Sequence, residues 1–112
     1  MIYKITAEQT RNLMINILFG TKRDAKRTYN NILWCLNNRR ERNETITEDS
    51  LKAALNFELG RYETTEDGQK VIFSINKDYS QTFFSAEHYD EGLELLHQAL
   101  MTKDWYKELL SK

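Results

Sequence analysis

The sequence predicts an α+β fold: a helix-rich single domain over residues 1–112 that contains a small antiparallel sheet. Three observations predict it. Apolar residues recur at helical spacing in several segments, next to residues that typically cap helices. The pair Asp67-Gly68 separates two β-prone runs, which is a strong hairpin signal. The chain has no proline and only four glycines, so we expect a compact body with short connections.

A helical hairpin is expected near the N-terminus, after a β-prone start over residues 1–5. Thr6 and Gln9 have the spacing of a capping box, which begins a helix that ends near Gly20. A second helix is expected over about residues 22–42. Because the connection between the two is short, we expect them to lie antiparallel.

Three more helices are expected further along the chain. Thr47 caps one over about residues 48–58, and its acidic first turn suits the helix dipole. Ser85 caps a long helix over about residues 86–101, and the final segment "DWYKELLSK" adds a short C-terminal helix.

The predicted sheet lies between these helices in the sequence. A two-residue turn at Asp67-Gly68 pairs Thr64 with Val71, and "YSQTFFS" supplies a third strand. The predicted order is therefore one short strand, three helices, two or three strands and two helices.

The net charge of −1 hides a division of charge along the chain. Residues 1–43 hold nine Lys/Arg and three Asp/Glu, a net charge of +6, whereas residues 44–112 hold seven and fourteen, a net charge of −7. This asymmetry indicates either two surfaces with different partners or two halves that attract each other, within the fold or between protomers.

Trp34 is the most informative single residue. On a helix over residues 22–42, the apolar stripe spans about 100° of the circumference, and Trp34 lies about 100° beyond its edge. Its neighbours there are basic and amide residues, and Arg40 is placed beside that face. The stripe consists of Ala25, Tyr29, Ile32, Leu33 and Leu36. The candidate partner-binding residues are Trp34, Arg23, Arg27, Asn30, Asn38 and Arg40.

Two interpretations of Trp34 stay open at this point. In one, another element such as the C-terminal helix covers the indole and forms a second small core. In the other, Trp34 is an exposed anchor among arginines, the two residue types most enriched at binding hot spots. The acidic hairpin tip at Glu66 and Asp67 is a second candidate contact, suited to a basic site on a partner.

No motif predicts catalysis, a metal or a cofactor. The four glycines are too far apart for a phosphate-binding loop, and the one cysteine, Cys35, excludes a multi-cysteine zinc site. His88 and His97 lie on opposite sides of the predicted helix over residues 86–101, so they cannot share a metal, and we expect a solvated polar face there.

The leading functional hypothesis is a small, non-catalytic cytoplasmic protein that occludes or regulates another protein. Inhibitors, immunity proteins and regulators from phages or other mobile elements have this size and this lack of catalytic motifs. The alternative is a nucleic-acid-binding protein that uses the basic helix over residues 22–42 with bases stacked on Trp34. A homodimer is a further arrangement that the divided charge allows, and no segment predicts a signal peptide or a membrane span.

Overall fold

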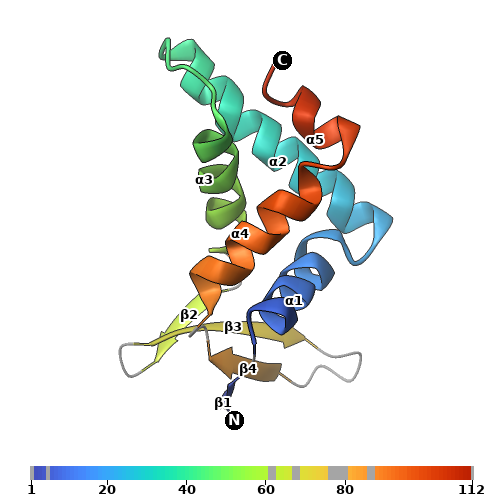
Figure 1. The fold of residues 1–112 in the computed structure, drawn as a ribbon, viewed down its shortest axis with the longest axis vertical. Coiled ribbons are helices and arrows are strands. Elements are labelled where there is room, and N and C mark those ends of the chain that lie inside the picture. The colour runs from blue at the N-terminus through green and yellow to red at the C-terminus, as the bar shows by residue number, and fades with distance from the viewer. Residues whose placement is uncertain are drawn as a thin grey trace.

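The computed structural model describes the backbone of residues 2–4, 6–60, 63–66, 69–75, 81–85 and 88–111, and the side chains of residues 6–60 and 88–111. Figure 1 shows the elements in chain order. The helices are α1 (Ala7–Phe19), α2 (Lys22–Glu41), α3 (Glu48–Leu59), α4 (Tyr89–Leu100) and α5 (Asp104–Glu108). The strands are β1 (Ile2–Lys4), β2 (Glu63–Glu66), β3 (Gln69–Ile75) and β4 (Gln81–Ser85).

Side-chain caps set where the first helices begin. The Thr6 hydroxyl accepts a hydrogen bond from the Gln9 N–H at 3.2 Å, and the Gln9 side chain accepts one from the Thr6 N–H at 2.9 Å, so the predicted capping box is confirmed. Thr47 precedes α3 as predicted. At the other end of the chain, α4 begins at Tyr89, later than predicted, with His88 as its N-cap.

The core of the described residues lies between helices. α1 packs against α2, α3 and α4, and α3 also packs against α2 and α4. α1 and α4 approach closely at Gly92, where an added Cβ would lie 2.7 Å from Thr10 Cγ2, so a larger residue would displace α1. The core side chains are Met14, Leu18, Ile32, Leu36, Leu51, Ala54, Leu55, Leu59, Tyr89, Leu96, Leu100, Tyr106 and Leu109.

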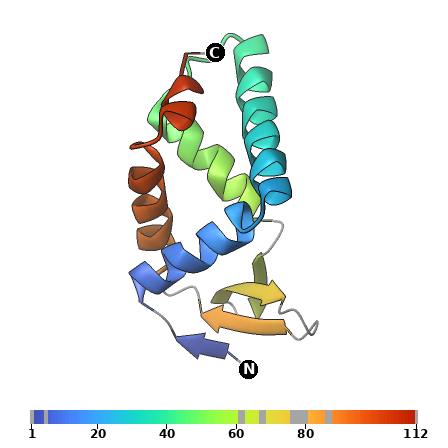
Figure 2. The same cartoon turned by 90° about the vertical axis from the view of Figure 1, so that its right-hand side faces the viewer.

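The four strands pair with one another in the order β1-β4-β3-β2. β1 lies parallel to β4, whereas β2 and β3 form an antiparallel hairpin in which Thr64 pairs with Val71, the register that the sequence predicts. Figures 1 and 2 show these strands together at one end of the helical body, beyond α1.

The α+β fold class is wrong for the body of the molecule, residues 6–60 and 88–111. This body is 78% helical and contains no strand or sheet, so it is an all-α fold. The prediction assigned the apolar helix faces to a sheet, but the helices bury those faces against one another.

The antiparallel helical hairpin is also corrected. Figure 2 shows α1 running across the start of α2 rather than alongside it, while α1 packs extensively on α4. A buried hydrogen bond from the Thr28 hydroxyl to the Leu18 carbonyl, 2.7 Å long, fixes this crossing. The short connection constrained where the two helices meet but not the angle at which they cross.

Candidate protein-binding face

α2 presents Trp34 to solvent. Ile32 and Leu36 on the same helix are completely buried, whereas 65% of the Trp34 surface is exposed. The helical periodicity therefore separates the two faces of α2 as predicted. The interpretation in which another element covers the indole is wrong for the part of the chain whose side chains the structure describes.

Phe57 on α3 is the second large exposed apolar side chain among the described residues, with 61% of its surface exposed. It lies with Trp34 on one hollow of about 400 Å³ between α2 and α3, which we name the Trp34–Phe57 groove. The groove is lined by Trp34, Cys35, Asn38, Arg39, Glu41, Arg42, Ala54 and Phe57.

Sequence reasoning missed Phe57, and the helical wheel gives only a weak signal for it. The buried residues Ala54 and Ser50 lie about 60° and about 20° from Phe57 around α3, so the wheel places Phe57 at the edge of the buried stripe. Trp34, in contrast, lies about 100° beyond the edge of the apolar stripe of its helix. What the wheel could not show is that α2 and α3 place the two rings on the same groove.

The rim of the groove carries charges of both signs. Glu44 accepts ion pairs from Arg39 and from Arg42, each with an N–O distance of 3.4 Å. Glu41 adds another carboxylate to the lining. Nearby carboxylates therefore balance the positive charges of Arg39 and Arg42. The groove offers polar groups of both charges around two aromatic side chains.

The other predicted residues of α2 lie at different distances from Trp34. Asn38 lines the groove. Asn30 is exposed on the same side of α2, one turn before Trp34. Arg27 and Arg23 share that side but lie about 10 Å and about 16 Å along the helix axis from Trp34. Arg27 also forms an ion pair with Asp24 at 3.1 Å. Arg23 and Arg27 therefore lie on the same face of α2 as Trp34 but outside the Trp34–Phe57 groove.

Arg40 lies on another side of α2. Its guanidinium donates a 2.9 Å hydrogen bond to Asn37 Oδ1 and another hydrogen bond to the backbone carbonyl of Leu109. Arg40 follows Trp34 by six residues, which turns it about 120° around the helix. It connects α2 to the end of α5 and does not border the Trp34–Phe57 groove.

The predicted second contact at the hairpin tip is not placed by the structure. Asp67 lies outside the described residues, as does the side chain of Glu66. The backbone of Glu66 pairs with Gln69 at the end of the β2–β3 hairpin. This contact stays a prediction from the sequence.

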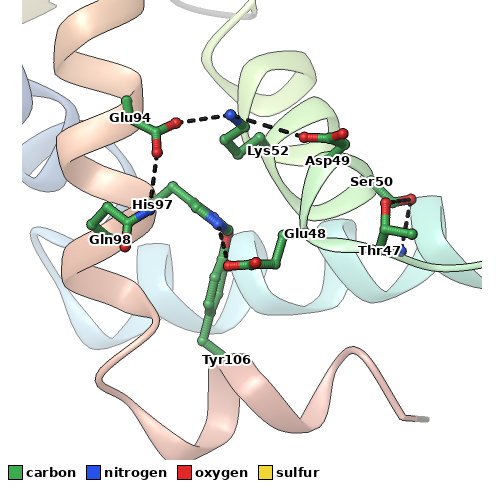
Figure 3. Close-up of polar contacts among 9 residues, drawn as sticks. All are labelled: Thr47, Glu48, Asp49, Ser50, Lys52, Glu94, His97, Gln98 and Tyr106. Atoms are coloured by element: carbon green, nitrogen blue, oxygen red, sulfur yellow. Dashed lines mark hydrogen bonds and ion pairs between the residues drawn. The ribbon is translucent and has the colours of Figure 1, made fainter.

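A polar chain joins α3, α4 and α5 at a distance from the groove (Figure 3). His97 Nδ1 lies 2.8 Å from the Tyr106 hydroxyl, and His97 Nε2 lies 3.2 Å from Glu48 Oε1. His97 is 1% exposed, so the prediction of a solvated polar face is wrong at this residue. Burial raises the pKa of Tyr106 well above its ordinary value.

A neighbouring exposed chain links α3 and α4, as Figure 3 also shows. Lys52 Nζ donates to Glu94 Oε2 at 2.8 Å, and the Gln98 amide donates to Glu94 Oε1 at 2.9 Å. The hydrogen bond from Lys52 lowers the pKa of Glu94, and the same bond raises the pKa of Lys52. These two hydrogen-bonded networks hold α3, α4 and α5 together.

No three His, Cys, Asp or Glu side chains among the described residues are grouped so that they could hold a metal ion. Within the same part of the chain, no helix is both long enough and apolar enough to cross a lipid bilayer. The chain matches no protein-family model, no curated protein and no solved structure.

Proposed function

We propose that this protein is a small, non-catalytic cytoplasmic binding protein that docks on a protein partner through the Trp34–Phe57 groove and thereby occludes or regulates that partner. One observation carries the proposal: two large aromatic side chains, both more than half exposed, border the same groove. Exposed apolar side chains gathered at one place typically mark an interaction site.

The geometry of the groove suits an interface of this kind. Trp34 and Phe57 project from two helices that are packed on each other, so their backbones are fixed before binding. Burying a rigid aromatic side chain costs little conformational entropy and removes a large apolar area from water. At a hot spot, truncation of such a residue to alanine costs about 2 kcal/mol or more, roughly a 30-fold loss of affinity.

The charges around the groove favour a protein over a nucleic acid. A nucleic acid presents a continuous row of phosphates and is bound by cations that release its counterions. Arg39 and Arg42 are instead paired with Glu44. A protein surface can exchange contacts with both signs, and the partner expected here offers apolar side chains to the rings and polar groups to the rim.

Capture with matched variants tests the proposal. Tagged wild-type protein, Trp34→Ala and Phe57→Ala are incubated with nuclease-treated lysate of the source cells, and the captured proteins are quantified by mass spectrometry. Lys107→Ala serves as the control because Lys107 lies on α5, away from the groove. We expect the same protein to be lost at least tenfold with both groove variants and retained with the control.

Stability measurements keep this result interpretable. Because Trp34 and Phe57 are mostly exposed, each alanine variant should unfold within about 0.5 kcal/mol of the wild type. Retention of every captured protein by both groove variants would overturn the proposal. A signal that is captured from untreated lysate but lost from nuclease-treated lysate, together with steeply salt-dependent binding of a generic single-stranded oligonucleotide, would support the nucleic-acid alternative instead.

A further inference from the structure

A second groove lies on the other side of α2, between α1, α2, α4 and α5. Its volume is about 470 Å³, within the range of small-molecule sites. Ala25 and Tyr29, which border it from α2, lie about 180° and about 140° around the helix from Trp34. We name it the Trp105 groove. It is lined by Ile15, Phe19, Ala25, Tyr29, Leu96, Ala99, Leu100, Lys103 and Trp105.

The walls of the Trp105 groove are apolar and held in place by packing. The Trp105 ring lies 5.9 Å from the Phe19 ring and 5.8 Å from the Tyr29 ring, measured between centroids. These three aromatic side chains come from three different helices, α5, α1 and α2. Leu96 and Leu100 of α4 line the groove and belong to the buried core. A site of this kind is largely formed before a ligand binds.

Positive charge lies at the edge of this groove. Lys103 is the charged residue of its lining. Lys103 forms no ion pair with a carboxylate of the residues whose side chains are described. An apolar groove with an unpaired cation in its lining is complementary to a ligand with an apolar chain and an anionic head.

We propose that the Trp105 groove binds a small amphiphilic carboxylate, with the hydrocarbon chain against Trp105 and the carboxylate at Lys103. The apolar chain replaces water on an almost wholly apolar lining, and each methylene buried contributes a favourable transfer free energy. The site is separate from the Trp34–Phe57 groove and does not depend on the function proposed for that groove.

A chain-length series tests this directly. The protein has two tryptophans, so a Trp34→Phe variant leaves Trp105, within the groove, as the single tryptophan, which is excited at wavelengths where the six tyrosines do not absorb. Octanoate, decanoate and dodecanoate are titrated below their micelle concentrations while Trp105 emission is followed. We expect saturable binding of one ligand per chain. The Kd should fall about fourfold for each added methylene until the groove is filled.

Two sets of variants test the position and the charge. Ala99→Phe and Ala25→Leu each add a side chain inside the groove and should weaken dodecanoate binding at least tenfold. Thermal unfolding of both variants checks that the fold is kept. Lys103→Glu should weaken carboxylates about fivefold and leave the binding of dodecanol unchanged. The absence of saturable binding to the parent, unchanged binding by the folded filled variants, or equal carboxylate affinity in Lys103→Glu would each overturn the proposal.

Discussion

Arg40 joins two parts of the helical body that are far apart in the sequence. Its guanidinium bonds to the carbonyl of Leu109, which directly follows α5. The last carbonyls of a helix have no partner within the helix, and an arginine near them supplies donors. A second bond to Asn37 fixes the side chain on α2. The half-buried guanidinium therefore holds α5 against the body.

Replacing Arg40 should lower the free energy of unfolding. Arg40→Met keeps the aliphatic stem and removes both hydrogen bonds, so we expect a loss of about 1–2 kcal/mol in a urea titration. Arg23→Met is the matched control, since Arg23 is an exposed arginine of the same helix, and it should change the unfolding free energy by less than about 0.5 kcal/mol. Equal effects of the two variants would contradict the role assigned to Arg40.

Residues of α2 also show what the sequence could and could not predict about the candidate site. Helical periodicity, a local property, placed Trp34 away from the buried stripe of α2, but it did not decide whether another element covers the indole. Periodicity also did not reveal the contact of Arg40, because its partner Leu109 comes from a distant segment. Phe57 joins the site through the packing of α3 on α2, a contact between segments that periodicity alone does not identify.

At the scale of elements, the Glu48–His97–Tyr106 chain connects three helices through one buried histidine. Both nitrogens of the His97 ring have a partner, one on α3 and one on α5. A buried polar group that loses its partner costs more than the bond itself contributes. The position of α5, which carries Tyr106 in the core, therefore depends on this chain.

Tyr106→Phe should destabilise the protein by about 1–3 kcal/mol, because it leaves His97 Nδ1 buried without its partner. The pH dependence should change as well. Burial raises the pKa of Tyr106 in the folded state, so its contribution is complete below its unfolded pKa of about 10 and is lost as the pH rises above that value. Urea titrations between pH 8 and pH 11 measure both effects.

The pH dependence of Tyr106→Phe is compared with that of the wild type in the same urea titrations. Tyr106→Phe has no hydroxyl at this position, so its unfolding free energy should fall less steeply above about pH 10 than that of the wild type. Parallel pH profiles for the two proteins, or a Tyr106→Phe variant as stable as the wild type at pH 8, would show that the buried chain does not hold α5 in place.

The order of the elements could be predicted from the sequence because caps and periodicity act locally. Thr6 and Thr47 each begin a helix as expected, and Thr64 pairs with Val71 across the hairpin. The partner of each apolar face could not be predicted in this way. Gly92 shows why. A glycine is needed at this position because Thr10 of α1 approaches it closely, and that contact exists only once α1 and α4 have packed together.

At the scale of the whole molecule, α2 separates two grooves of different character. The Trp34–Phe57 groove has a rim of mixed charge, and the Trp105 groove has an apolar lining with one lysine, Lys103. Glu44 pairs with Arg39 and Arg42 across the boundary at residue 43, so the basic and the acidic segments of the sequence contact each other there. We propose that the Trp34–Phe57 groove is the site of protein binding.

Site-specific photo-cross-linking in the source cells tests that claim most directly. Phe57 is replaced by p-benzoylphenylalanine, and the same replacement at Lys107 on α5 serves as the control. We predict that irradiation gives one discrete adduct with a different protein from position 57, which Trp34→Ala strongly reduces, and no such adduct from position 107. Failure to form an adduct at position 57, or an adduct that contains only two copies of this chain, would contradict the claim.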